Sequence, residues 1–386
     1  MKLDRPYRRA FLSVLFAIAA HTLPLTAQAS EVVFGQVASL SNPTSASNAR
    51  GLVAGISACF ETINAKGGVN GHRLKLVTKD DGLQADKMAE LTQELVNDAS
   101  IVGLMSYLNT GGINALAKEN AFAKDGVALI APLQGDRNVV EADNVFPLRS
   151  GYADEVNALL KEAKSWGKEI IAIVNMNIAF GPVLAELAQK QAAPMGLRIV
   201  SHSVLDSNPE RIDASVAAAV KAVATSQPKA ILLLAAGRPA TAFAKAVRET
   251  PAGTTQIYAL SVLLHAELVK AIGPDKARGI VLSQVIPYPF TQSAPVIAEY
   301  QRAMTQFAPA EPLSYSSLEG YLGARIAAEA VRRAGPVVNR ERLLASLRTM
   351  GEYNLGGVYV NYSPAQKKGW GGVDLTIIDS GGNLRK

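Results

Sequence analysis

The feature that most constrains the fold is an alternation of short apolar segments with longer segments whose apolar residues recur every three to four positions. Val32–Val37, Ile170–Val174 and Ala230–Ala235 are segments of the first kind, and Asn48–Ala65 and Phe180–Met195 are of the second. Continuous apolar strands between amphipathic helices are typical of parallel sheets that helices cover on both faces. The alternation therefore predicts an α/β fold built from doubly wound parallel sheets.

The alternation runs in two series, one starting near Ser30 and the other near Tyr152. A chain of 386 residues also exceeds what one hydrophobic core usually supports. We therefore predict two lobes joined by three crossings, with lobe I at residues 30–148 and 287–352 and lobe II at 149–286 and 353–386. Ligands of such sheets bind beyond the carboxyl ends of the strands, so the site is expected in the cleft between the lobes.

The first 29 residues have the three parts of a secretory signal. A basic start is followed by the apolar run Ala10–Ala20 and by Ala27-Gln28-Ala29, which fits the small-x-small cleavage rule. The apolar run is short for a membrane span, and no Cys follows the cleavage position to carry a lipid. Residues 1–29 hold four basic residues and one acid, so their removal lowers the formal net charge from +6 to +3. We expect a protein exported to the periplasm.

The motifs of common enzyme and metal sites are missing from the sequence. There is no phosphate-binding loop, no G-x-S-x-G and no H-E-x-x-H, and neither His72, His202 nor His265 has a Cys or His at metal-ligand spacing. We predict no catalytic residue, metal or cofactor. Basic clusters with interleaved aromatics are also missing, which argues against a nucleic-acid partner. Asp80-Asp81 is interpreted as a loop whose acids cap the next helix, with acid–base chemistry as the alternative.

One segment carries a resemblance to a known family. Residues 63–74 read INAKGGVNGHRL and are followed by Asp80-Asp81. This stretch resembles the periplasmic receptors of the leucine/isoleucine/valine-binding type, where a helix ends in I-N-x-x-G-G-v-x-G before a strand that leads to D-D or D-x. Further stretches resemble the family in order along the chain: 131–135 (APLQG), 146–155 (FPLRSGYADE), 179–181 (AFG), 284–289 (QVIPYP) and 318–321 (LEGY).

The resemblance implies the type I periplasmic-binding-protein fold, a small-molecule ligand held by hinge closure, an inner-membrane permease of an ABC-type uptake system as partner, and a monomer. Thr110 opens a helix at the place where the family binds a ligand carboxylate, although a plain N-cap is the alternative. Tyr152 and Phe180 are expected to form aromatic walls, or else to pack in the hinge or core. The full set of implied ligand-binding residues is Tyr107, Asn109, Thr110, Leu133, Gln134, Gly135, Tyr152, Asn177, Phe180, Ser261 and Gln284.

Arg149 has two interpretations: it could bind a ligand carboxylate bidentately, or it could brace Asp154, Glu155 or Glu319 at the hinge. The sequence also departs from the family. The relatives hold the ligand ammonium with an acid after a G-Y-x-P turn, whereas residues 236–240 read AGRPA, with no acid at Ala240. The expected ligand is therefore a small carboxylate, either an amino acid or an aromatic or aliphatic acid. A receptor for a chemoreceptor or sensor kinase, and less so a hydrolase of small acids or amides, are the alternative functions.

Overall fold

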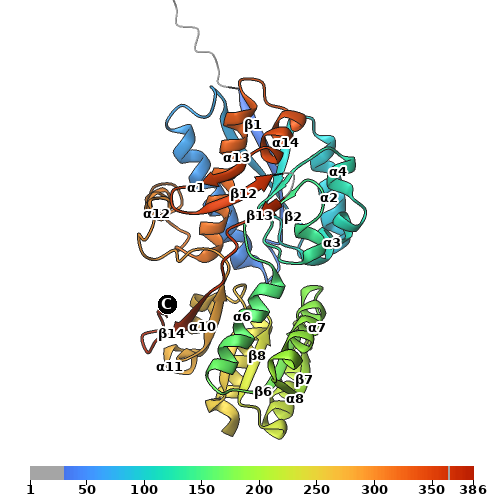
Figure 1. The fold of residues 1–386 in the computed structure, drawn as a ribbon, viewed down its shortest axis with the longest axis vertical. Helices are drawn as coiled ribbons and strands as arrows, with labels where there is room; N and C mark the ends of the chain where they lie inside the picture. The colour runs from blue at the N-terminus through green and yellow to red at the C-terminus, as the bar shows by residue number, and fades with distance from the viewer. Residues whose placement is uncertain (1–29, 364–365) are drawn as a thin grey trace, which may run out of the picture.

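The computed structural model describes residues 30–363 and 366–386, and the predicted signal sequence lies outside these residues. Two lobes, stacked along the long axis, each contain a helix-covered sheet (Figure 1). The predicted α/β fold with parallel sheets in two lobes is thereby confirmed. Among the described residues, no helix combines the length and the apolar character that crossing a membrane requires.

The sheet of lobe I is wholly parallel and has the strand order β2-β1-β3-β4-β5. Successive side chains of a strand point to opposite faces, and β1 shows this directly. Val32 and Phe34 pack in the cluster that contains Leu52 of α1, while Val33 and Val37 pack in the cluster that contains Met88 of α2. The strands are β1 (Glu31–Ala38), β2 (Arg73–Asp80), β3 (Ile101–Met105), β4 (Leu129–Ile130) and β5 (Val145–Phe146).

Helices cover both faces of this sheet. Three of them come from the chain after residue 284, where it returns from lobe II to lobe I. The longest of these three, α13, packs along α1. This agrees with the expected return of residues 287–352 to lobe I. The helices of lobe I are α1 (Ala46–Asn64), α2 (Ala85–Asn97), α3 (Thr110–Lys118), α4 (Ala121–Lys124), α5 (Arg137–Val140), α12 (Pro295–Phe307), α13 (Tyr315–Ala334) and α14 (Arg340–Arg348).

The sheet of lobe II has the order β15-β14-β10-β9-β8-β6-β7. It is parallel from β7 to β10, and β14 and β15 are antiparallel additions from the C-terminal segment. Its strands are β6 (Ile170–Met176), β7 (Arg198–Leu205), β8 (Ala230–Leu234), β9 (Gln256–Ala259), β10 (Val281–Gln284), β14 (Asp374–Ile378) and β15 (Leu384–Arg385). Its helices are α6 (Tyr152–Ser165), α7 (Phe180–Ala192), α8 (Ile212–Ser226), α9 (Gly237–Arg248), α10 (His265–Ile272) and α11 (Pro274–Ala277), with 3₁₀ turns at Ala193–Met195 and Pro251–Thr254.

A small third sheet does not follow the expected division of the chain. β11 (Gly351–Asn354), β12 (Tyr359–Ser363) and β13 (Gln366–Lys368) form an antiparallel sheet beside lobe I (Figure 1). The Tyr362 ring lies 5.4 Å from that of Phe146, and its hydroxyl donates to the Pro147 carbonyl over 2.7 Å. The expected start of the returning segment of lobe II at residue 353 is therefore wrong; the chain crosses after β13. The reason is that these strands bury only a few side chains, such as Val360 and Tyr362, and contain no continuous apolar run that would mark them as part of a lobe.

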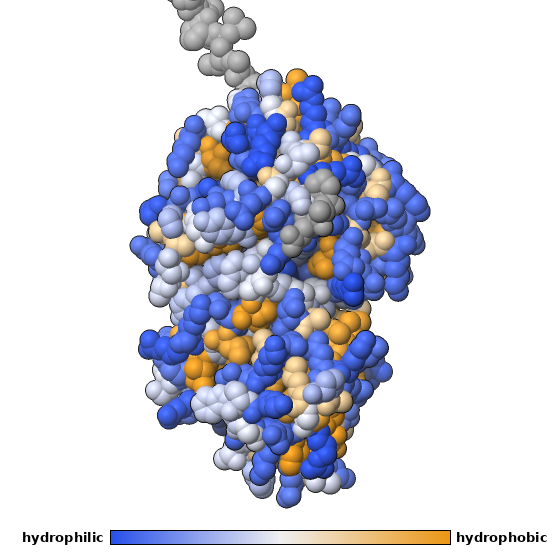
Figure 2. Space-filling model, viewed as in Figure 1, coloured by the Kyte–Doolittle hydropathy of each residue, from blue (hydrophilic) through white to orange (hydrophobic). Residues whose placement is uncertain are grey.

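The chain passes between the lobes at three crossings, which lie between β5 and α6, between β10 and α12, and between β13 and β14. The first and third crossings run side by side. The backbone N–H of Trp370 donates to the Leu148 carbonyl over 2.7 Å, and the Ser150 hydroxyl donates to the Gly372 carbonyl over 2.7 Å. Figure 2 shows the narrow waist at which the two lobes meet. The two segments of chain are thus hydrogen-bonded to each other where the lobes join.

Arg149 lies in the first crossing and braces it against lobe I. Its Nε and Nη2 donate to the two carboxylate oxygens of Glu319 on α13, over 2.9 and 2.8 Å, and both side chains are buried. Burial alone would lower the pKa of the Arg149 guanidinium, but the charge and hydrogen bonds of Glu319 outweigh it and raise the pKa. Of the two interpretations of Arg149, the structure therefore supports the brace and not a ligand contact.

Candidate functional site

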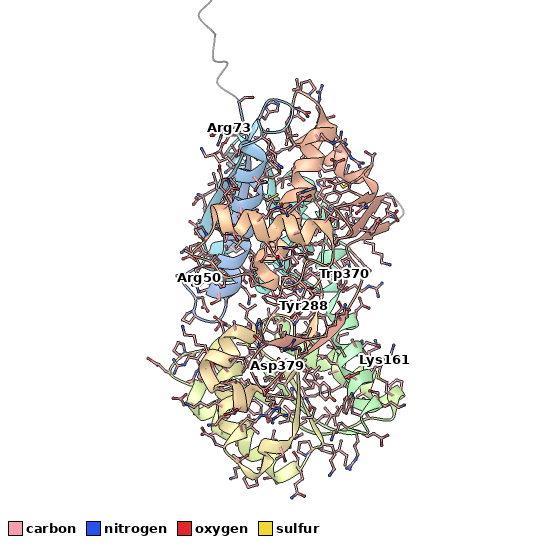
Figure 3. All side chains as sticks on the ribbon, turned by 90° about the vertical axis from the view of Figure 1, so that its left-hand side faces the viewer. Arg50, Arg73, Lys161, Tyr288, Trp370 and Asp379 are labelled. Carbon is pink, nitrogen blue, oxygen red and sulfur yellow. The ribbon has the colours of Figure 1, made fainter. Side chains whose placement is uncertain are left out.

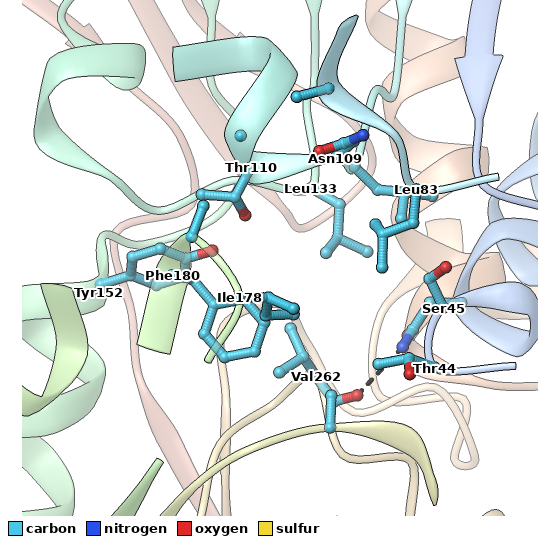
Figure 4. Close-up of a pocket in the computed structure, with 16 residues that line it drawn as sticks. Thr44, Ser45, Leu83, Asn109, Thr110, Leu133, Tyr152, Ile178, Phe180 and Val262 are labelled. Atoms are coloured by element: carbon cyan, nitrogen blue, oxygen red, sulfur yellow. Dashed lines mark hydrogen bonds between the residues drawn. The ribbon is translucent and has the colours of Figure 1, made fainter. Parts of the chain in front are cut away.

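A pocket of about 260 Å³ lies between the lobes, and every wall of it stands beyond the carboxyl end of a strand (Figure 4). This is the location at which open α/β sheets bind ligands. Lobe I contributes the segments after β1, β2, β3 and β4, and lobe II those after β6, β8 and β9, together with the start of α6. The lining residues are Thr44, Ser45, Asn48, Leu83, Ala85, Leu108, Asn109, Thr110, Gly111, Leu133, Tyr152, Ile178, Ala179, Phe180, Ala236 and Val262.

The N-terminus of α3 forms the polar end of the pocket. Asn109 is its N-cap: Oδ1 accepts the N–H of Gly112 over 3.3 Å. In the described part of the chain, the N–H groups of Thr110 and Gly111 have no hydrogen-bond partner. Two free N–H groups at a helix N-terminus that lines a pocket can bind an anion such as a carboxylate.

Asp81 fixes the orientation of that cap. Its carboxylate accepts from the Asn109 side-chain amide over 2.9 Å, from the Ser39 hydroxyl over 2.6 Å and from the N–H of Leu83 over 2.9 Å. Asp80 accepts from the N–H groups of Leu40 and Gly82. The expected role of this pair as caps of the next helix is wrong, because α2 begins at Ala85 and no side chain forms a capping hydrogen bond at its start. The two acids instead join three loops at the edge of the pocket.

Tyr152 and Phe180 form an aromatic wall on the lobe II side. Their ring centroids are 6.4 Å apart at an interplanar angle of 51°. Burial raises the pKa of the Tyr152 phenol to about 12, against the opposing effects of Arg149 and Thr110, so at neutral pH its hydroxyl keeps its proton. Gly135 supports this wall from outside the pocket, since its carbonyl accepts the N–H of Tyr152 over 2.8 Å and a Cβ there would lie 2.6 Å from the Tyr152 ring.

Five of the expected binding residues line this pocket: Asn109, Thr110, Leu133, Tyr152 and Phe180. The other six do not. The Tyr107 side chain is buried in the core, Gln134 turns back to accept the N–H groups of Gly135 and Asp136, and Asn177 is exposed and accepts the N–H of Ser207. Gly135 lies behind Tyr152, and Ser261 and Gln284 line a different cavity.

Sequence reasoning missed one side of the pocket, which is formed by the residues that follow β1 in the chain. Thr44, Ser45 and Asn48 line the pocket, and none of them was expected there. A signal was available, because residues 39–45 (SLSNPTS) directly follow the carboxyl end of an apolar strand. The resemblance placed the relatives' acid at Ala240, but that residue is buried in α9 and it is Ala236 that lines the pocket.

No charged side chain is among the residues that line the pocket. Its polar groups are hydroxyls, side-chain amides and the N–H groups at the start of α3, and the remainder is apolar. His72 hydrogen-bonds to Ser30 and Pro336, and His202 to Asn175, all outside this site. Within the described residues, no group of three or more His, Cys, Asp or Glu side chains could hold a metal ion. The arrangement is suited to holding an apolar molecule with one anionic or polar end.

The lobes contact each other around the pocket. The Asn48 side-chain amide of lobe I donates to the Val262 carbonyl of lobe II over 3.0 Å, and Ser47 hydrogen-bonds to Glu267. Gly237, at the start of α9, lies so close to the Thr44 backbone that a Cβ there would be 2.6 Å from its Cα and carbonyl oxygen. These contacts define a closed arrangement in which the pocket is shared between both lobes.

Removal of the Asn109 side chain tests whether the cap shapes the site. We expect Asn109→Ala to lower the free energy of unfolding by about 1–3 kcal/mol, because both the cap and the hydrogen bond to the buried Asp81 carboxylate are lost, and to weaken ligand binding as well. Asn339→Ala is the matched control: Asn339 caps α14, accepting the N–H of Arg342 over 2.9 Å, and does not line the pocket. Urea unfolding should give a loss for both variants, and a larger one for Asn109→Ala because the buried Asp81 carboxylate also loses a donor. Calorimetry should find weaker binding only for Asn109→Ala. If Asn109→Ala bound the ligand as tightly as the unsubstituted protein does, the N-terminus of α3 would not be part of the binding site.

Two lobes around a shared, uncharged cleft are the form of a receptor that captures a small solute. A model of the periplasmic binding protein family matches residues 31–383. The chain therefore belongs to the periplasmic binding protein family, whose members bind solutes, and the resemblance to the leucine/isoleucine/valine type is confirmed.

Solved structures and a curated relative agree with this assignment. A substrate-binding periplasmic protein from Ralstonia solanacearum has a TM-score of 0.85 at 26% identity, with 92% of this chain and 99% of that chain covered. A branched-chain amino acid transporter protein from Thermus thermophilus, solved with bound valine, shares the fold with a TM-score of 0.81 at 18% identity, with 92% and 95% covered. The Leu/Ile/Val-binding protein homolog 2 of Brucella abortus is 23% identical over 147 residues, which are 37% of this chain and 39% of that protein.

Proposed function

We propose that this chain is the periplasmic receptor of an ABC-type uptake system and that it binds a small molecule with a carboxylate and an apolar body. The observation that carries the proposal is the pairing of an uncharged, mostly apolar pocket with the two free N–H groups at the start of α3. The carboxylate would lie at these N–H groups and the Thr110 hydroxyl, and the apolar body against Leu133 and Phe180. Hinge closure would hold the ligand and present the closed form to an inner-membrane permease, with the receptor as a monomer.

The absence of an acid among the lining residues favours a carboxylate without an ammonium group. An amino acid would bring a positive charge into a pocket whose only partners for it are carbonyl and hydroxyl oxygens, and burying an unpaired charge is costly. An aliphatic or aromatic acid has no such group. We therefore rank such acids above branched-chain amino acids as ligands.

The direct test compares leucine with 4-methylpentanoate, which has the same carbon skeleton and carboxylate but lacks the ammonium. Thermal-shift measurements on the mature chain, extended to aromatic acids and dicarboxylates, should show stabilisation by simple acids, because a ligand that binds only the folded state raises the melting temperature. Calorimetry then gives the affinities, and recovery of unchanged ligand after long incubation checks that it is bound and not hydrolysed. Tight binding of leucine or valine with no binding of simple acids would refute the ligand class.

An acid placed in the pocket should shift this preference. We expect Ala236→Asp to improve the ratio of leucine to 4-methylpentanoate affinity by about tenfold or more, because a hydrogen bond to a charged group contributes about 1.5–3 kcal/mol. Ala236→Asn has nearly the same shape without the charge and is the matched control. An unchanged ratio in Ala236→Asp would mean that position 236 does not face the ligand.

A further inference from the structure

A second cavity, of about 340 Å³, lies beside the candidate site and is also shared by the lobes. Asn48 and Val262, which are hydrogen-bonded to each other, line the first pocket, and their chain neighbours Ser47 and Ser261 line the second. The second cavity is lined by Ser47, Arg50, Ser261, Leu263, Leu264, His265, Ala266, Glu267, Gln284, Ala310, Glu311, Pro312, Leu313, Ser314 and Tyr315. Figure 3 shows Arg50 and Tyr288 at the level where the lobes meet.

Three buried residues of this lining carry a polar atom without a partner among the described residues. These atoms are Ser261 Oγ, Gln284 Oε1 and the Tyr315 hydroxyl oxygen, and the three residues are 8%, 3% and 7% exposed. Buried polar atoms are nearly always hydrogen-bonded, because leaving one unsatisfied is costly. Three residues that line one cavity each carry such an atom, which indicates that the cavity holds a polar occupant.

The orientation of Gln284 defines what the occupant must supply. Its amide nitrogen donates to Thr376 Oγ1 over 3.0 Å, and the Thr376 hydroxyl in turn donates to the Leu282 carbonyl. Gln284 Oε1 is therefore the free atom, and a carboxamide oxygen can only accept. The occupant has to offer a hydrogen-bond donor, which the Ser261 and Tyr315 oxygens can accept as well.

Charges at the rim favour a cation. Arg50 Nη2 donates to the Ser47 hydroxyl over 2.9 Å, and the Ser47 hydroxyl donates to Glu267, so these two opposite charges are joined through Ser47. Glu311 forms no ion pair in the described part of the chain. Burial raises the pKa of the Glu311 carboxyl, and the nearby charge of Arg50 opposes this effect. The lining thus holds two carboxylates, Glu267 and Glu311, against the one guanidinium of Arg50, which leaves a net negative charge.

We propose that this cavity is a second ligand site, which takes a small primary ammonium ion whose N–H groups are accepted by Gln284, Ser261 and Tyr315 and whose charge is balanced by Glu311. The site is distinct from the carboxylate pocket, and its existence does not depend on the function proposed for that pocket. Because residues of both lobes line it, its ligand also favours the closed arrangement.

The test titrates the mature chain with n-butylammonium and follows binding by NMR line shifts and calorimetry. Two comparison probes separate the chemistry: tetramethylammonium carries the charge without an N–H donor, and n-butanol has a donor without the charge. We expect saturable binding of butylammonium, at least tenfold tighter than of either probe. Absence of saturable binding, which would mean that only water fills the cavity, or equal binding of either comparison probe, would overturn the proposal.

Variants locate the site. Gln284→Met removes the acceptor Oε1 together with the amide that donates to Thr376, and Tyr315→Phe removes one hydroxyl. Both keep nearly the same shape and should weaken butylammonium binding about tenfold. Gln93→Met on the exposed face of α2 and Tyr359→Phe on β12 make the same substitutions elsewhere and should leave binding unchanged. Two independent variants keep the test valid if one of them fails to fold. Unchanged binding in whichever of the two folds would overturn the assignment.

Discussion

Gly237→Ala is expected to weaken ligand binding about 5- to 150-fold while the chain stays folded. An added Cβ would lie 2.6 Å from the Cα and the carbonyl oxygen of Thr44 in the other lobe, and backbone atoms cannot move aside as a side chain can. Relieving overlap of this kind typically costs about 1–3 kcal/mol, and here the lobes can relieve it by staying apart. Calorimetry with the best-binding acid measures the loss, and small-angle scattering should show an extended shape that the ligand no longer compacts.

The matched control is Gly167→Ala, also in lobe II. Gly167 has a φ of +66°, close to the +56° of Gly237, so both substitutions carry the same backbone strain. A Cβ at Gly167 meets nothing within 4 Å. The two variants should therefore lose similar stability, and only Gly237→Ala should lose affinity. Full affinity in Gly237→Ala would show that ligand binding does not require the closed arrangement seen here.

Arg149→Met is expected to lower the free energy of unfolding by about 3–5 kcal/mol. The substitution leaves the Glu319 carboxylate, which is 1% exposed, without its bidentate partner, and an unpaired buried charge is far more costly than a missing pair. The double variant Arg149→Met/Glu319→Met removes both charges and should recover most of the loss. Urea unfolding followed by circular dichroism measures all three proteins.

An exposed ion pair provides the control for this experiment. Arg137 and Glu141 are bonded at 2.9 Å, but their side chains are 85% and 62% exposed. Arg137→Met should change the free energy of unfolding by less than about 0.5 kcal/mol, since exposed pairs contribute little. A similar small loss for Arg149→Met would contradict the role of Arg149 as the brace of the first crossing.

The fold could be predicted from the sequence because the apolar residues of its strands and helices recur at regular spacings within short segments. Each apolar run, such as Ile170–Met176, needs helices on both faces, and the order of strands and helices then leaves few topologies. The segment from Gly351 to Lys368 could not be placed in this way. Its strands pack on lobe I through scattered side chains, such as Val360 and Tyr362, whose positions in the sequence follow no helical or long strand period.

The position of the candidate site could be predicted, but the directions of its side chains could not. The rule that ligands lie beyond the carboxyl ends of strands points to Thr110 and Leu133, and both line the pocket between the lobes. The rule does not predict that the Gln134 side chain turns back to its own backbone, because neighbouring side chains of a loop can point in opposite directions. Ser261 and Val262 show the consequence, since adjacent residues line two different cavities.

The hydrogen bonds between the first and third crossings restrict how the lobes can move. Bending both segments together preserves the bonds from Trp370 to Leu148 and from Ser150 to Gly372, whereas twisting one lobe about the long axis would shear them apart. We therefore expect the softest motion of the proposed closure to be a bending of both segments together, which would bring the walls of the pocket into the same mutual register each time. A receptor that closes in this way would select its solute by the geometry of one repeatable closed state.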